Sequence, residues 1–259
     1  MRFRAVVFDF DGLIVDTETA WFRAYDAYFR KYGARLDPDA WGRGVGTEWT
    51  AFDPHRELES LTGRRIDPER MRADVQQLYE REMENAGVLP GVTSYLDEAR
   101  RLGLKVGLAS SSPRDWVMSY LAKYGLASRF DCIRTADDVR RVKPDPELYV
   151  KALECLGVPA PAALAFEDSA NGALAAVRAG LVCVVVPNPV TERMRFPDGV
   201  RRLRSMADVP LSSLLSKLER ERGGNPDETS RAQPGGEGSR PEEAGGTRSQ
   251  TGGYRADRL

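Results

Sequence analysis

The chain has 259 residues, of which 41% are hydrophobic and 8% aromatic, enough to bury one substantial core and a second, smaller one. It carries 38 Lys plus Arg and 39 Asp plus Glu, for a formal net charge of -1. This balance provides no field that would attract nucleic acid or an anionic membrane surface, so we expect neither as a partner.

The sequence contains no apolar run near the roughly 20 residues that span a bilayer. The first apolar run ends at Asp9 and is too short for a secretory signal. Cys132, Cys155 and Cys183 are odd in number and widely spaced, which argues against a disulfide framework or a Cys-rich zinc site. We therefore expect a cytoplasmic protein. A monomer is also expected, because no apolar surface stripe is left unassigned.

The first predicted element is a buried strand over Ala5 to Phe10. A different pattern follows, in which aromatic residues from Trp21 to Tyr32 recur at helical spacing. Asp37-Pro38 and Asp53-Pro54 add two helix starts on either side of a glycine-rich turn at 42–46. These signals predict an all-helical insertion, tethered at both ends near the carboxyl end of the first strand. Such an insertion would form a lid over that edge.

From residue 89 onward, apolar runs alternate with helical patterns that begin near Ser or Pro and end at Gly. The predicted strands are Lys105 to Ala109, Cys132 to Ala136, Ala163 to Phe166 and Leu181 to Pro187. Helices are predicted from Ser112-Pro113 to Gly125, from Asp145-Pro146 to Gly157 and from Ser169 to Gly180. This alternation predicts an α/β fold, a Rossmann-like parallel sheet with helices on both faces.

The last segment, residues 222–259, is rich in glycine and contains no Ile, Val, Phe, Trp or Met. Such a composition predicts a disordered tail. The predicted organisation is therefore core over 1–16, helical cap over 17–88, core over 89–221 and tail over 222–259.

Polar residues follow each predicted strand, and in an open parallel sheet ligands bind beyond these carboxyl ends. Asp9 and Asp11 follow the first strand, whereas Glu167 and Asp168 end a later one. Four acids at one edge form a set of hard oxygen ligands suited to Mg²⁺. The sequence therefore predicts a divalent cation as cofactor.

Lys143 and the serines at 110–112 lie at the same predicted edge and could hold an anion. Taken singly, each of these residues is better explained as a helix cap or a surface charge. Their occurrence together at four strand ends favours one phosphate site. The chain has no Gly-x-x-x-x-Gly-Lys-Ser/Thr loop and no Gly-x-Gly-x-x-Gly after the first strand, so nucleotide-driven chemistry is not indicated.

Four motifs in order resemble the haloacid dehalogenase superfamily, in the branch of β-phosphoglucomutases and phosphatases with a helical cap. The motifs are Asp9-Phe10-Asp11-Gly12, Leu108-Ala109-Ser110-Ser111-Ser112, Val142-Lys143-Pro144 and Phe166-Glu167-Asp168-Ser169. The resemblance covers roughly residues 1–215. It implies an Mg²⁺-dependent phosphatase that acts on a small phosphorylated metabolite, such as a sugar phosphate.

The resemblance also implies a role for each motif residue. Asp9 would be the nucleophile that forms an aspartyl-phosphate, and Asp11 the general acid and base. Ser110, Ser111 and Lys143 would hold the phosphoryl group. The metal ligands would be Asp9, Asp11 through its backbone carbonyl, Asp168 and, directly or through water, Glu167.

Three alternatives differ from this interpretation. A β-phosphoglucomutase would share the core, but such mutases carry a His where this chain has Trp21 and a cap Arg where it has Thr47. A dehalogenase would lack the second aspartate of the first motif, here Asp11. A non-enzymatic phospho-receiver would have no use for the cap and would carry its acid pair first.

The cap is expected to determine specificity, with Arg43, Thr47 and Trp49 as the predicted contacts. Hinges are predicted at Thr17 and at 85–90. His55, the only histidine, is interpreted as a structural residue of the cap.

Overall fold

The computed structural model describes residues 2–47 and 52–223. Its sheet has six strands, all paired in parallel, in the order β3-β2-β1-β4-β5-β6. The strands are β1 (Ala5–Phe8), β2 (Lys105–Ala109), β3 (Cys132–Arg134), β4 (Ala163–Glu167), β5 (Val182–Val185) and β6 (Arg201–Arg202). The predicted α/β class is therefore confirmed. The sequence did not predict the two-residue strand β6.

Two apolar cores lie on opposite faces of this sheet. Side chains alternate along β1, so that Val6 and Phe8 join one core whereas Ala5 and Val7 join the other. The first face is covered by α5 (Val92–Arg101), α6 (Arg114–Lys123) and α9 (Leu211–Gly223). The second is covered by α7 (Glu147–Leu156) and α8 (Ala170–Arg178). Short 3-10 turns lie at Ala127–Arg129, Ala136–Asp138 and Ala160–Ala162.

Among the described residues, the cap consists of the helices that lie between β1 and α5: α1 (Thr17–Arg30), α2 (Pro38–Gly42), α3 (Pro54–Thr62) and α4 (Pro68–Met83). Three of them begin at an Asp-Pro pair, where the side chain of Asp37, Asp53 or Asp67 accepts hydrogen bonds from first-turn amides. The first two pairs were predicted as helix starts and the third was not, although its sequence signal is the same.

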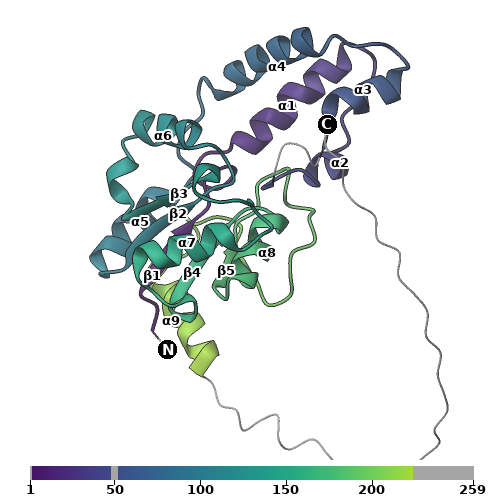
Figure 1. Cartoon of the computed structure of the whole chain (residues 1–259). Coiled ribbons are helices and arrows are strands. Elements are labelled where there is room, and N and C mark those ends of the chain that lie inside the picture. Colours follow the sequence, from purple (N-terminus) through teal and green to yellow (C-terminus); the bar gives the residue numbers. More distant parts are fainter. Residues whose placement is uncertain (1, 48–51, 224–259) are drawn as a thin grey trace, which may run out of the picture. The chain divides into compact units, whose positions relative to one another are not determined.

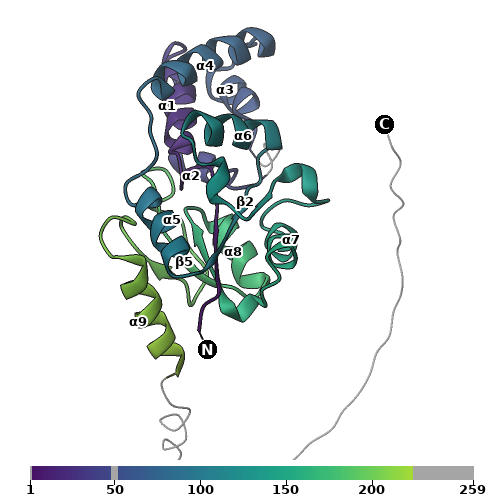
Figure 2. The same ribbon diagram turned by 90° about the vertical axis from the view of Figure 1, so that its left-hand side faces the viewer.

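The cap lies beyond one end of the sheet (Figures 1 and 2). The two connecting segments run side by side, because Leu89 N–H donates to Ile14 O at 2.8 Å. The cap's glycine-rich turn rests on the core, where Asn171 Nδ2 donates to Val45 O at 2.8 Å and Ser111 Oγ to Gly46 O at 3.1 Å. A Cβ on Gly46 would lie 2.3 Å from Ser169 Oγ, so only glycine permits this approach.

The expectation about the cysteines is wrong for one pair. Cys132 on β3 and Cys155 on α7 form a disulfide, whereas Cys183 is a buried free thiol. The two residues are 23 positions apart in sequence, but the α7–β3 contact brings their Cα atoms to 6.2 Å. The spacing of the cysteines along the sequence does not show that α7 packs against β3.

The predicted tail also begins too early, because α9 extends to Gly223. The remainder of that segment, and Trp49, lie outside the described residues. Within the described ranges, no helix is both long and apolar enough to cross a membrane.

Candidate active site

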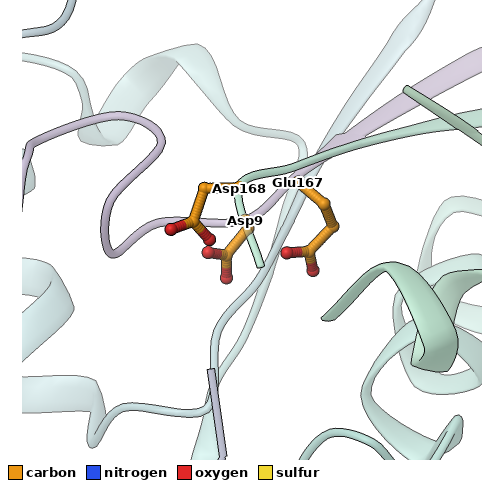
Figure 3. A group of neighbouring side chains, drawn as sticks. All are labelled: Asp9, Glu167 and Asp168. Carbon is orange, nitrogen blue, oxygen red and sulfur yellow. The ribbon is translucent and has the colours of Figure 1, made fainter. Parts of the chain in front are cut away.

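Three acids converge where β1 and β4 end. The N–H of Asp9 donates to Phe166 O at 2.9 Å and continues the pairing of the two strands. Glu167 is the last residue of β4, and Asp168 follows it. All three are buried, and one oxygen from each lies within 4.8 Å of the others. Figure 3 shows the three carboxylates turned to the same side of the strands.

Lys143 lies among these acids, with only 1% of its side chain exposed. Its Nζ donates to Asp9 Oδ1 at 2.5 Å and to Glu167 Oε1 at 2.7 Å. The hydroxyl of Tyr149 on α7 also donates to Glu167 Oε1. Lys143 thus forms ion pairs with two of the three acids, Asp9 and Glu167.

Burial sets the protonation equilibria of this cluster. Loss of hydration raises the pKa of Asp9 to about 8, although Lys143 opposes the shift. Burial and the neighbouring carboxylates raise the pKa of Asp168 well above its ordinary value. Burial alone would lower the pKa of Lys143, but Asp9 and Glu167 outweigh it and raise that pKa. Three acids thus share one lysine, and burial together with their mutual repulsion favours the neutral forms of Asp9 and Asp168.

The donor set fits a divalent cation. Glu167 Oε2 and Asp168 Oδ1 are buried without a hydrogen-bond partner among the described residues. The other oxygen of Asp168 accepts from Asn188 Nδ2 at 2.8 Å. Gly12 and Gly172 leave room here, since a Cβ on either would lie within 2.3 Å of an Asp168 or Glu167 oxygen. Carboxylate oxygens are hard ligands of the type that Mg²⁺ prefers.

Asp11 lies beside this cluster, half-buried, with hydrogen bonds to both oxygens. Its Oδ1 accepts from Thr17 Oγ1 at 2.9 Å and from Trp116 Nε1 at 2.8 Å. Its Oδ2 accepts from Ser112 Oγ at 2.6 Å and, at 3.4 Å, from Ser110 Oγ. The structure thus brings Asp9, Asp11, Lys143 and the serines to one edge of the sheet.

A cavity of about 440 Å³ opens between this edge and the cap. Asp9, Asp11, Ser111 and Thr47 line it. The other lining residues include Glu18, Arg72, Gln76 and the aromatic side chains of Trp21, Tyr25, Trp41, Phe52 and Trp116. Burial and the nearby aspartates raise the pKa of Glu18 well above its ordinary value.

Of the two other cap predictions, the structure places only Arg43, and it lies away from this cavity. Arg43 lines a separate cleft formed with Arg193 and Arg195, so the structure does not bring it to the acids. Trp49 is not among the described residues. His55 lies half-buried in the cap, with Nε2 2.8 Å from Ile66 O, which suits a structural residue.

Three residues that donate hydrogen bonds to the acids of the site were not predicted from the sequence. Asn188 follows β5 and could have been found by the strand-end rule that identified Glu167. Tyr149 and Trp116 lie on helices α7 and α6, and no local pattern distinguishes them from core aromatics. They reach the site only through the packing of those helices on the sheet.

Comparison with known proteins adds independent findings. Residues 6–186 match the model of the "Haloacid dehalogenase-like hydrolase" family. The chain is 45% identical over 215 residues to "Putative phosphatase YhcW" of Bacillus subtilis, covering 83% of this chain and 97% of that protein. It is 33% identical over 218 residues to hexitol phosphatase B of Escherichia coli, covering 81% and 92%.

A solved structure has the same architecture. The crystal structure of a "putative beta-phosphoglucomutase" from Thermotoga maritima matches with a TM-score of 0.64 and 27% identity, covering 84% of this chain and 99% of that one. The parallel sheet, the acids at its carboxyl edge and the helical cap define a capped α/β hydrolase. The chain belongs to the haloacid dehalogenase-like hydrolase family and is a phosphoric monoester hydrolase.

Proposed function

We propose that the protein is an Mg²⁺-dependent phosphatase that hydrolyses a sugar or alditol phosphate through a phosphorylated Asp9. The observation that carries the proposal is the buried cluster of Asp9, Lys143, Glu167 and Asp168, of which Asp9 lines the cavity. A nucleophile, a fixed cation and a set of metal ligands are the parts that phosphoryl transfer requires.

Asp9, Asp168, Glu167 and the backbone carbonyl of Asp11 would hold Mg²⁺. When bound, the ion would neutralise charge on the transferring phosphoryl group. Lys143 fixes the carboxylate of Asp9 through the 2.5 Å contact and adds positive charge on the same side. The hydroxyls of Ser110 and Ser111 lie at this edge and would donate to the remaining phosphoryl oxygens.

Two displacements complete the reaction. A carboxylate oxygen of Asp9 attacks phosphorus, the phosphorus bond to the ester oxygen breaks, and Asp11 gives its proton to the leaving alkoxide. Asp11 then takes a proton from water, which attacks phosphorus, so that the bond to Asp9 breaks and inorganic phosphate leaves. The carboxylate of Asp9 and the protonated Asp11 are both restored.

The cavity walls support a polyhydroxylated substrate. Aromatic side chains such as Trp21 and Trp41 offer flat surfaces for the C–H faces of a carbohydrate. Glu18, Arg72 and Gln76 offer hydrogen-bonding groups for hydroxyls. The hexitol phosphatase among the relatives acts, by its name, on the same chemical class. Of the predicted specificity residues, Thr47 stays in this proposal because it lines the cavity.

The test is phosphate release from a panel of phosphates of hexoses, pentoses and hexitols, with Mg²⁺ or with a chelator. We expect Mg²⁺-dependent release, strongest for one sugar or alditol phosphate. Release that persists in chelator would contradict the metal requirement. A panel on which only non-carbohydrate esters react would contradict the substrate class.

A β-phosphoglucomutase remains the second candidate, because the Thermotoga maritima protein carries that name. Trp21 occupies the position where the mutases carry a His, and its ring is stacked on Tyr79 with centroids 3.9 Å apart. The absence of that His favours hydrolysis over return of the phosphoryl group to a sugar. Formation of glucose 6-phosphate from β-glucose 1-phosphate, without net phosphate release, would favour the mutase instead.

The expectations of a monomer and of a cytoplasmic enzyme also stay proposals. The Cys132–Cys155 disulfide argues against a strongly reducing compartment. Thiol titration of the protein purified without reductant would measure whether this pair is oxidised.

A further inference from the structure

The two oxygens of Asp11 accept hydrogen bonds from different kinds of donor. Oδ2 faces the hydroxyls of Ser112 and, at a longer distance, Ser110. Oδ1 faces the hydroxyl of Thr17 and the indole N–H of Trp116. A hydroxyl can turn and accept, but an indole nitrogen can only donate. Among these four partners of Asp11, Trp116 is therefore the one that can act only as a hydrogen-bond donor.

The ring of Trp116 is itself held in place. It lies in the first turn of α6 and is half-buried. Its centroid is 5.1 Å from that of Tyr120 on the same helix, 5.8 Å from Tyr79 and 6.3 Å from Trp21, both on the cap. The N–H thus points at Asp11 from a side chain that is packed against both core and cap.

We propose that Trp116 is a positioning residue for Asp11. Its indole N–H holds Oδ1 as the carbonyl-type acceptor and leaves Oδ2, which faces rotatable hydroxyls, to carry the proton that passes to the leaving group. This inference rests on the proposed phosphatase function and adds to it a residue outside the four family motifs. Because Trp116 also lines the cavity, it links the position of Asp11 to the wall that the substrate touches.

The consequence depends on the leaving group. A sugar or alditol alkoxide is a poor leaving group and needs the proton of Asp11 as its bond to phosphorus breaks. The 4-nitrophenolate ion is stable in neutral water and leaves without a proton. Loss of the indole N–H should therefore slow hydrolysis of the sugar phosphate much more than that of 4-nitrophenyl phosphate.

The experiment compares three variants with the wild-type enzyme on both esters. Trp116→Phe keeps an aromatic ring but has no donor, whereas Trp116→Gln loses the ring but keeps an N–H at a similar reach. Tyr120→Phe is the matched control, since it removes a polar atom from the same aromatic cluster, the hydroxyl 2.8 Å from that of Tyr79, without touching Asp11.

We expect Trp116→Phe to lower kcat on the sugar phosphate roughly tenfold to a hundredfold and on 4-nitrophenyl phosphate by about twofold or less. KM should change little for either ester. Trp116→Gln should be more active than Trp116→Phe on the sugar phosphate, and Tyr120→Phe should match the wild type.

A purely structural role for the ring predicts the opposite order, with Trp116→Gln the less active variant and equal losses on both esters. That order, or an unchanged or higher kcat for Trp116→Phe on the sugar phosphate, would overturn the inference. If the wild-type enzyme hydrolyses neither ester, the proposed function itself fails, and the two failures are thus distinct.

Discussion

Lys143 is the residue whose environment departs furthest from what its type suggests. A lysine side chain is rarely buried, yet the side chain of Lys143 is almost fully buried between the carboxylates of Asp9 and Glu167. Such a pair adds stability only while each charge keeps its partner. The same contact that would orient the nucleophile is therefore also a structural requirement of the core.

Replacement of Lys143 should reveal this double role. Lys143→Met leaves buried carboxylates without their cation, so we expect the free energy of unfolding to fall by about 3–5 kcal/mol and phosphatase activity to be lost. Denaturant unfolding monitored by circular dichroism measures the first effect. Lys151→Met, on the outer side of α7, is the control and should unfold like the wild type; a Lys143→Met protein of normal stability would contradict the ion-pair account.

Ligands of an open parallel sheet bind beyond the carboxyl ends of its strands, and this rule explains which site residues could be predicted. Asp9 and Asp168 come at or just after the ends of apolar runs, so the order of residues along the chain was enough to assign them to one edge of the sheet. The partners of Lys143 and the donor from Trp116 depend on how α6 and α7 pack on the sheet. No spacing along the chain contains that information.

At the scale of elements, local signals were strong where they involved backbone chemistry. The Asp-Pro pairs at Asp37 and Asp53 begin helices as predicted, because proline suits the first helical position and the aspartate accepts the free amides. Elements without such signals were missed or misplaced. The strand β6 has only two residues, and α9 runs on to Gly223, past the predicted start of the tail.

Glu98 joins two elements that are distant in sequence. Its carboxylate accepts from the N–H of Leu211 at 2.7 Å, at the start of α9, while the side chain belongs to α5. Burial would raise the pKa of Glu98, but hydrogen bonds from Ser212 and Leu211 outweigh it and lower that pKa below its ordinary value of 4.5. The charged form therefore stabilises the docking of α9.

A lowered pKa in the folded state stabilises the protein above pH 4.5, and the contribution is lost as the pH falls through the folded-state value. We expect Glu98→Gln to lower stability at neutral pH by about 0.5 kcal/mol, a modest effect because water partly screens this group. The difference from the wild type should shrink at lower pH. Thermal unfolding across this range measures it, with Glu154→Gln on α7 as the control; a difference that grows on acidification would contradict the assignment.

In the molecule as a whole, the cap and the core meet around a cavity, and the proposed metal ligands lie on the core side. The proposed cation would contact the buried oxygens of Glu167 and Asp168 that have no hydrogen-bond partner among the described residues, and it would thereby stabilise the folded chain. Binding to the folded state alone raises stability by mass action. The metal can therefore be detected without any substrate.

We expect Mg²⁺ at about a hundredfold excess over its Kd to raise Tm by several degrees, corresponding to about 2.7 kcal/mol. Asp168→Asn should abolish most of this shift, because it removes a charged ligand. Asp115→Asn, an exposed acid on α6, should retain the full shift. Equal shifts in both variants would place the cation elsewhere.

Asp9 is the nucleophile in the proposed mechanism, and replacing it with Asn tests that role. Phosphate release by the wild-type enzyme and by Asp9→Asn is measured with the same sugar or alditol phosphate and the same Mg²⁺. Burial already disfavours the charged form of Asp9, so the neutral amide should preserve the fold. We predict a loss of at least roughly a thousandfold in kcat at an unchanged Tm. A well-folded Asp9→Asn enzyme that keeps most of its activity would contradict the account.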